Sequence, residues 1–123
     1  MEFHKIMVHA VLTCNEQDKA VDIAKKLKEN KERRIFVVDD NDNLKGVITT
    51  TDLVYKAFEK KDVSAKQIMT KNVKHVDVKD DLEKALEIMN EIKSFVCPLT
   101  EDGKILGVVS HHDILSHVLG SLE

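Results

Sequence analysis

The stretch that decides the fold is LKGVITTTDL at residues 44–53, because the chain repeats its pattern as ILGVVSHHDI at residues 105–114. In both copies an apolar run with a glycine leads to a hydroxyl residue, two spacers and an aspartate, and then to an amphipathic run. The two aspartates, Asp52 and Asp113, differ by 61 in residue number (113 − 52). The pattern predicts a β-strand that runs directly into the N-terminus of a helix, twice.

The composition is typical of one small globular domain without a strong charge. The chain has 123 residues, 42% of them hydrophobic, and a formal net charge of −3. A repeat of about 61 residues alone buries too little surface for high stability, so we expect the two copies to share one core. The charge gives no general attraction to nucleic acid, and we expect none as a partner.

The sequence shows no pattern typical of export or membrane insertion. The first residues lack the apolar stretch of a signal peptide, and no apolar run reaches the length of a membrane span. Cys14 and Cys97 lie far apart and form no CxxC pair, which favours buried, reduced thiols. We therefore expect a cytoplasmic protein with no membrane partner.

Hydrophobic periodicity predicts the same order of elements in both halves, with residues 59–63 as the connector. The first half is expected to have strands at 8–13, 35–38 and 44–49 and helices at 17–30 and 52–58. The second half is expected to have a helical turn at 64–69, extended residues at 73–78, strands at 96–99 and 105–110, and helices at 80–92 and 112–119. The residues expected to face the core from the helices at 17–30 and 80–92 are Ala20, Val21, Ala24 and Leu27, and Leu82, Ala85, Leu86 and Met89.

The apolar positions of the halves correspond at a constant spacing of 61 residues, without a gap from Val21 onward. Ile35 corresponds to Val96, for example, and Leu53 to Ile114. This agreement indicates an internal duplication. We expect an α+β fold of two β-α-β-β-α repeats, residues 1–62 and 63–123, related by a pseudo-twofold axis.

The repeated motif allows a structural and a functional interpretation. Thr49 with Asp52, and Ser110 with Asp113, have the spacing of a capping box, which alone explains these residue types. However, a helix N-terminus that follows a strand also attracts phosphate, and a nearby carboxylate suits the hydroxyls of a ribose. The glycine in each copy would let a ligand approach the backbone closely. We favour ligand binding slightly over capping alone.

The duplication and the motif together resemble a pair of cystathionine-β-synthase (CBS) domains, also called a Bateman module. The family pattern is matched by Val37-Val38-Asp39 with residues 46–52, and by Leu99 with residues 107–113. The lead-in segment at residues 68–73 is also characteristic. The resemblance covers essentially the whole chain and implies a stand-alone sensor that binds adenosine-containing ligands in clefts between the repeats.

The resemblance also implies the ligand-binding residues. The motif aspartates would hold the ribose hydroxyls, their neighbours would lie near ribose and phosphate, the lead-in segment would contact the base, and a basic residue before the middle strand would reach phosphate. These residues are Arg34, Thr49, Thr50, Asp52, Lys71, Asn72, Val73, Ser110, His111, His112 and Asp113.

The sequence departs from the family pattern at several places. Phe95 stands where Arg34 stands in the first copy, so the two sites should differ. A proline usually precedes the apolar pair of the middle strand, but Phe36 takes its place in the first copy, and Pro98 comes one position late in the second. Thr100 replaces the acid that follows the pair.

Other chemistry is less well supported. His111, His112 and Asp113 with His117 suggest a metal site, but the spacing places no third and fourth ligand, so we expect none. The run from Asp39 superficially suggests a calcium loop, but it lacks the required glycine and final acid. No P-loop, Rossmann fingerprint or nucleophile motif indicates an enzyme.

The sequence therefore predicts a non-catalytic regulatory module that binds AMP, ADP, ATP or a related adenosine compound as a regulatory ligand, with no cofactor. The resemblance further implies a homodimer, and a stand-alone sensor needs a downstream protein target, which the sequence does not identify. The alternative is a structural dimerisation or adaptor module without a ligand, in which the motif residues act only as helix caps.

Overall fold

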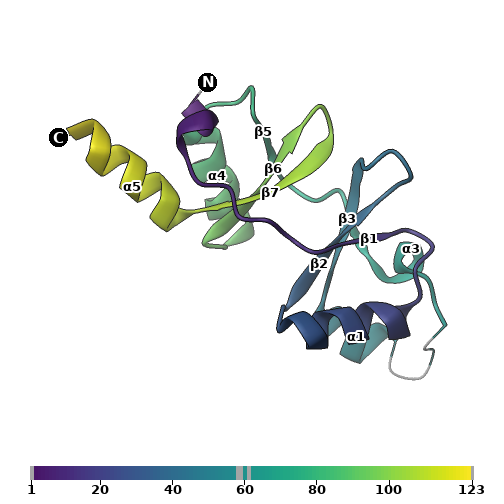
Figure 1. Cartoon of the computed structure of the whole chain (residues 1–123). Helices are drawn as coiled ribbons and strands as arrows, with labels where there is room; N and C mark the ends of the chain where they lie inside the picture. Colours follow the sequence, from purple (N-terminus) through teal and green to yellow (C-terminus); the bar gives the residue numbers. More distant parts are fainter. Residues whose placement is uncertain (1, 58–59, 61, 123) are drawn as a thin grey trace. The chain divides into compact units, whose positions relative to one another are not determined.

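The structure, a computed structural model, describes residues 2–57, 60 and 62–122 (Figure 1). It confirms a mixed α+β fold with two small sheets. The elements up to the middle of the chain are a 3-10 turn (Glu2–Lys5), β1 (Thr13–Asn15), α1 (Ala20–Asn30), β2 (Arg34–Val38), β3 (Leu44–Thr49), α2 (Thr50–Lys56), α3 (Ala65–Ile68) and β4 (Thr70–Lys71). The remaining elements are β5 (Val76–Asp77), α4 (Leu82–Ile92), β6 (Val96–Glu101), β7 (Lys104–Ser110) and α5 (His111–Leu122).

The chain packs as two compact units, each of which combines residues of both sequence repeats. The first-repeat unit is Leu12–Val73, and the second-repeat unit combines Met1–Val11 with Lys74–Glu123. The buried side chains of the described residues form one hydrophobic cluster in each unit, where the sequence predicts one shared core. Each sheet covers its apolar face with helices of its own unit, so each unit buries a core of its own.

The sheet of the first-repeat unit has the strand order β1-β2-β3-β4. The β1 strand is parallel to β2, and the other two pairings are antiparallel. The α1 helix buries Ile23 and Leu27 in the same cluster as Ile35 and Val37 of β2. The α1 helix ends at Lys31, which takes the left-handed conformation that commonly terminates helices.

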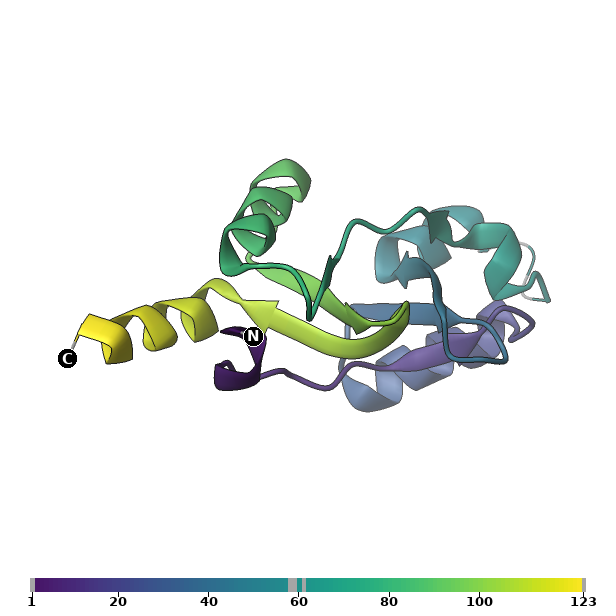
Figure 2. The ribbon, with the colours of Figure 1, turned by 90° about the horizontal axis from the view of Figure 1, so that it is seen from above.

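The sheet of the second-repeat unit has the order β5-β6-β7, and the N-terminal segment lies along its β7 edge (Figure 2). His9 and Val108 form an antiparallel bridge through two backbone hydrogen bonds of 2.9 Å. In the first-repeat unit Thr70 of β4 pairs with Val47 of β3 in the same way. Both residues of this pair differ by 61 from their counterparts (70 − 9 and 108 − 47). The segment before each repeat thus pairs with the strand of the other repeat, which explains the composition of the two units.

The strand registers show that the two repeats do not correspond without a gap. Val37 lies opposite Gly46, and Leu99 lies opposite Gly107. The spacing is therefore 62 residues between β2 and β6 (99 − 37), but 61 between β3 and β7 (107 − 46). The prediction of a constant spacing is wrong by one residue, and the difference lies in the hairpin loop. A continuous apolar strand gives no periodic signal that would reveal such a shift.

The gap changes which residues of the two repeats are equivalent. At a spacing of 62, the counterpart of Arg34 is Val96, and not Phe95. Pro98 takes the place of Phe36, so this proline is not one position late. Two further pairs follow from the same spacing, Thr100 with Val38 and Glu101 with Asp39. An acid therefore follows the corresponding pair in both repeats, although Thr100 replaces the second apolar residue of the pair in the second repeat.

The predicted inward faces of the two helices are partly wrong. In α1 the buried residues are Ala20, Ile23 and Leu27, while Ala24 is exposed. Similarly, α4 buries Ile88 and leaves Leu86 exposed; its buried residues are Leu82, Ala85, Ile88 and Met89. Both helices carry apolar residues on more than one side, so periodicity alone does not select the side that packs against the sheet.

Candidate functional site

The predicted site residues fall into two groups, one in each unit. Seven lie in the first-repeat unit, namely Arg34, Thr49, Thr50, Asp52, Lys71, Asn72 and Val73. Four lie in the second-repeat unit and follow one another at the junction of β7 and α5, namely Ser110, His111, His112 and Asp113.

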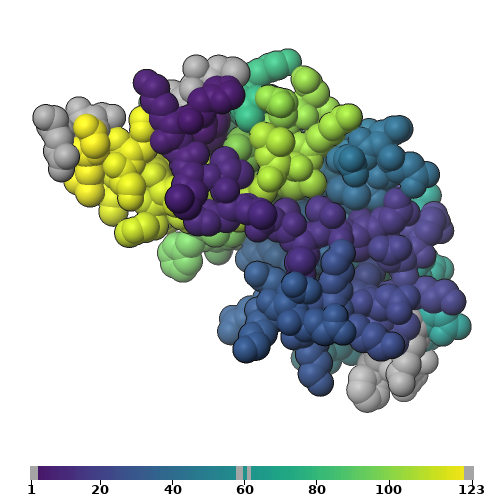
Figure 3. Space-filling model, viewed as in Figure 1, coloured from purple at the N-terminus to yellow at the C-terminus, as the bar shows by residue number. Residues whose placement is uncertain are grey.

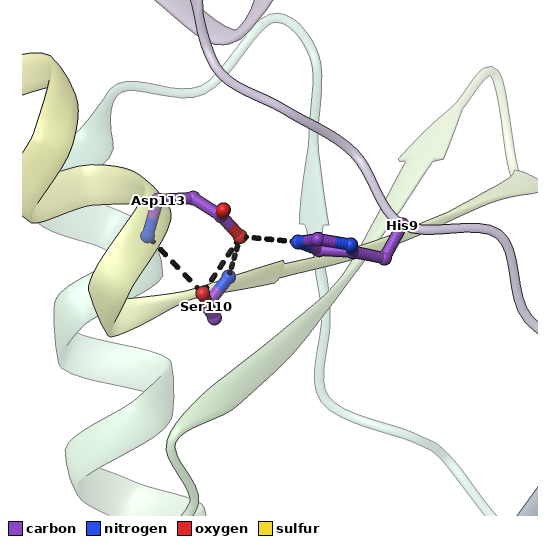
Figure 4. Close-up of polar contacts among 3 residues, drawn as sticks. All are labelled: His9, Ser110 and Asp113. Atoms are coloured by element: carbon purple, nitrogen blue, oxygen red, sulfur yellow. Dashed lines mark hydrogen bonds and ion pairs between the residues drawn. The ribbon is translucent and has the colours of Figure 1, made fainter.

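The second-repeat group is organised around the carboxylate of Asp113 (Figure 4). Its Oδ2 accepts hydrogen bonds from the Ser110 backbone N–H at 2.9 Å and from the Ser110 hydroxyl at 2.7 Å. The Asp113 backbone N–H donates in turn to the Ser110 hydroxyl oxygen at 3.1 Å. The capping box that the sequence predicts is therefore formed.

A residue that the sequence analysis did not identify completes this arrangement. The Nε2 atom of His9 lies 2.9 Å from Oδ2 of Asp113, although 104 residues separate them in the chain. His9 reaches this position because its backbone pairs with Val108 of β7. In the space-filling view the N-terminal residues lie against atoms of β7 and α5 (Figure 3).

The surroundings of Asp113 favour its charged form. Burial raises the pKa of this carboxyl, but the hydrogen bonds from the hydroxyl and the backbone of Ser110, together with the contact to His9, outweigh that effect. The pKa of Asp113 is therefore below its ordinary value of 3.8. At neutral pH, Asp113 presents a carboxylate.

The first-repeat group forms the corresponding capping box with a different additional partner. The Thr49 backbone N–H donates to Oδ2 of Asp52 at 2.9 Å, and the Asp52 backbone N–H donates to the Thr49 hydroxyl oxygen at 3.2 Å. Oδ1 of Asp52 forms an ion pair with Nζ of Lys56, 3.4 Å away on the same helix. This contact was available to sequence reasoning, because residues four apart on a helix are neighbours.

The basic residue expected beside the first-repeat motif does lie next to it. Arg34 is exposed at the start of β2, where its Cα lies opposite Thr49. Thr50, the first residue of α2, is exposed, and its backbone N–H donates to the Arg33 carbonyl at 3.0 Å. The equivalent hydrogen bond in the second repeat joins His111 to the Phe95 carbonyl at 2.9 Å. The first repeat thus has two adjacent arginines here, Arg33 directly before β2 and Arg34 at its first position.

In the second repeat, Phe95 and Val96 take the places of those arginines. The rings of Phe95 and His111 meet edge to face, with their centroids 5.7 Å apart. They border a pocket of about 400 Å³, which Leu86, Met89, Asn90, Lys93 and Ser94 also line. Phe95 is 79% exposed, so its ring is available to a ligand. His112, the next residue of α5, is also exposed.

The lead-in residues of the second repeat lie away from the Thr49–Asp52 motif. Lys71 of β4 pairs with Gly46, near the opposite end of β3. Asn72 follows with a positive φ of 56°, and Val73 is half-buried. Lys71 and Asn72 line a second pocket of about 530 Å³, together with Glu16, Asp39, Lys45, Lys66 and Met69.

The two motif glycines have a structural explanation that differs from the one predicted. A Cβ atom at Gly107 would lie 2.3 Å from the His9 carbonyl oxygen, and one at Gly46 would lie 2.9 Å from the Thr70 carbonyl oxygen. Both glycines therefore make room for the strand segment that pairs beside them. The close approach is made by the chain itself.

The described residues contain neither a cluster of metal ligands nor a helix that could cross a membrane. Within residues 2–57, 60 and 62–122, no three His, Cys, Asp or Glu side chains are grouped as ligands of one metal ion. None of the helices in these ranges combines the length and the apolar character needed to span a bilayer.

Comparison with known proteins identifies the family. The family model of the CBS domain matches residues 3–59 and 65–120, which is most of the chain and both repeats. This chain belongs to the CBS domain family and is a pair of CBS domains. The matched family is not a catalytic one.

Among curated relatives, an uncharacterized protein of Methanopyrus kandleri is 31% identical over 110 residues, which are 85% of this chain and 56% of that protein. The chain spans only 56%, 31% and 22% of the lengths of three such relatives. The third is the inosine-5'-monophosphate dehydrogenase of Methanocaldococcus jannaschii, which is 31% identical over 114 residues and 90% of this chain.

Several solved structures share the fold. Hypoxic Response Protein I, solved with two coordinated zinc ions, has a TM-score of 0.77 at 20% identity and covers 91% of this chain and 94% of its own. The cytosolic domain of the Mg²⁺ channel MgtE in complex with ATP has a TM-score of 0.74 at 23% identity, over 87% of this chain and 44% of its own. The CBS domain pair of MJ0100, solved with 5'-methylthioadenosine and S-adenosyl-L-methionine, has a TM-score of 0.69 at 21% identity, over 98% and 95%. At these identities the similarity concerns the fold alone.

Proposed function

We propose that this CBS domain pair is a non-catalytic regulatory module that binds an adenosine-containing ligand, such as AMP, ADP, ATP or S-adenosylmethionine. The observation that carries the proposal is that Asp113 is ionised and hydrogen-bonded through only one of its two carboxylate oxygens. Its Oδ2 is held by Ser110 and His9, while Oδ1 receives no hydrogen bond from the described part of the chain. An ionised, oriented oxygen of this kind suits a ribose hydroxyl as donor. The ligands bound to MgtE and to MJ0100 support the adenosine class.

Asp52 would contribute to a site in the first repeat with a different preference, because its Oδ1 already pairs with Lys56. Lys56 and Arg34 place positive charge near Asp52 and Thr49, which favours a ligand that carries phosphate. In the second repeat, Phe95 and His111 offer aromatic surface beside the motif. Binding would act as a signal by shifting the equilibrium between two arrangements of the module, which requires different affinities for the two.

The proposal is tested by a thermal-shift titration with AMP, ADP, ATP, NAD and S-adenosylmethionine, each with and without magnesium, and with GTP as the control for the base. A ligand at one hundred times its dissociation constant adds about 2.7 kcal/mol to the free energy of unfolding. The shift should saturate for at least one adenosine compound, and Asp52→Asn or Asp113→Asn should reduce it. The control Asp22→Asn removes an exposed carboxylate in the first turn of α1 and should leave the shift unchanged.

One observation favours the adaptor function as a second candidate. The exposed face of α5 carries Leu115, Val118 and Leu119, which are apolar and spaced as helical neighbours. Both capping boxes are also complete without a ligand. If the adaptor function holds, no compound of the panel produces a shift at millimolar concentration, and Asp113→Asn costs about 0.5–1 kcal/mol of stability without affecting binding.

The homodimer, the cytoplasmic location and the downstream protein target stay predictions. Size-exclusion chromatography with light scattering tests the first, and cell fractionation tests the second. The target can be sought by affinity capture with the nucleotide-saturated and the nucleotide-free protein, since a regulatory module should bind its target differently in these two states.

A further inference from the structure

His9 is held in place by its backbone, independently of its side chain. Its N–H donates to the Val108 carbonyl, and its own carbonyl accepts from the Val108 N–H, both at 2.9 Å. Gly107 allows this close approach, because any side chain there would collide with the His9 carbonyl. The imidazole therefore projects toward α5 from an anchored segment (Figure 4).

The imidazole completes the hydrogen bonding of one carboxylate oxygen only. Oδ2 of Asp113 is in contact with three groups, namely the N–H of Ser110, its hydroxyl, and Nε2 of His9, at 2.9, 2.7 and 2.9 Å. A carboxylate oxygen has about two lone-pair sites, so these three contacts leave Oδ2 no capacity for a further donor. The Asp113 side chain is only 10% exposed, whereas that of His9 is 49% exposed. The carboxylate is fixed in one orientation, and Oδ1 is left for another donor.

The first repeat lacks this arrangement. Thr70 is the counterpart of His9, since 70 and 9 differ by 61, and no hydrogen bond joins its side chain to Asp52 in the described residues. Instead, Oδ1 of Asp52 faces the ammonium group of Lys56. Among the described residues, Oδ1 therefore has an ion-pair partner in Asp52 but no hydrogen-bond donor in Asp113.

We propose that His9 is a positioning residue that sets the preference of the Asp113 motif for a ligand with free ribose hydroxyls. This inference rests on the proposed function. By holding Oδ2, the imidazole prevents the carboxylate from rotating and orients Oδ1 toward the ribose, where it accepts a hydrogen bond from a hydroxyl group. Orienting an acceptor before binding increases affinity only for ligands that supply the matching donor.

The test compares ATP with 2',3'-dideoxy-ATP, and AMP with 2',3'-dideoxy-AMP, by isothermal titration calorimetry. The full chain carries Asp52→Asn, so that the measured affinity is that of the Asp113 motif alone. His9→Leu and His9→Ala remove the imidazole, whereas His9→Gln keeps a side-chain N–H donor. His4→Leu replaces an exposed histidine of the same N-terminal segment and is the matched control.

His9→Leu and His9→Ala should lower the ratio of the affinity for the ribose form to that for the dideoxy form by about tenfold. The affinity for the dideoxy form itself should change little. His9→Gln should recover most of the preference, and His4→Leu should not alter it. The inference is overturned if folded His9→Leu or His9→Ala keeps the preference, or if both forms weaken equally, as a general structural role would predict. If the chain with intact Asp52 and His9 binds neither ATP nor AMP, this inference fails. The proposed function fails with it if no other adenosine compound of the panel binds.

Discussion

Gly107 lies so close to His9 that a Cβ atom would be placed 2.3 Å from the His9 carbonyl oxygen. The φ of Gly107 is also +156°, which L-residues rarely adopt. The backbone of His9 can lie this close to residue 107, nearly one hundred positions later in the chain, only because glycine has no side chain. The contact joins the N-terminal segment to β7 and, through the His9 imidazole, to Asp113.

Gly107→Ala should therefore destabilise the protein by about 1–3 kcal/mol, because the obstacle is backbone that cannot move without breaking the His9–Val108 pairing. Chemical denaturation measures the free energy of unfolding. Gly120→Ala is the matched control, since its Cβ would meet no atom within 4 Å and alanine favours the α5 helix by up to about 1 kcal/mol. Equal effects of the two substitutions would contradict the assigned contact.

The lowered pKa of Asp113 makes a testable contribution to the pH dependence of stability. Because the folded pKa lies below its ordinary value of 3.8, this contribution is fully present above that value and is lost as the pH falls through the folded pKa. The pKa values of Asp39 and Asp77 are also lowered, Asp39 mainly by the Asn43 N–H and Asp77 mainly by the Lys79 N–H. Overall stability should therefore fall in acid.

Asp113→Asn isolates the contribution of this residue. Wild type should melt at a higher temperature than the variant near neutral pH, and the difference should shrink as the pH falls below 3.8. Melting curves across this range measure it. A difference that stays constant with pH would show that the carboxylate charge does not contribute.

The corrected inward face of α1 predicts which helix residue stabilises the first-repeat core. Ile23 is fully buried against β2, so Ile23→Ala should cost about 2–5 kcal/mol through lost burial and the cavity left behind. Val54→Ala removes a 60% exposed apolar side chain and should change stability by less than about 0.5 kcal/mol. Denaturant titration distinguishes the two, and a small loss for Ile23→Ala would contradict the packing of α1.

Both cysteines should be unreactive in the folded protein. Burial raises the pKa of the Cys14 thiol to about 12 and that of the Cys97 thiol to about 11, so almost no thiolate exists at pH 8. A colorimetric thiol reagent should react slowly with the native chain and label two thiols after unfolding in guanidinium. Rapid labelling of either thiol in the native protein would contradict its burial.

Much of the fold followed from short-range patterns. The strand Leu44–Thr49 was predicted at its observed position. The helix predicted at 52–58 begins at Thr50 and ends at Lys56, and both capping boxes formed as their spacing indicates. These features depend on residues within a few positions of one another. Their hydrogen bonds close locally, so the residue types alone are sufficient to specify them.

The tertiary structure decided everything that depends on which segments lie side by side. Pairing of the N-terminal segment with β7 brought His9 to Asp113, and strand register placed the one-residue gap in the hairpin loop and gave Arg34 the counterpart Val96. No local pattern encodes these contacts, because backbone pairing along a strand is nearly the same for every residue. Only the packing of the apolar side chains selects one register from the others.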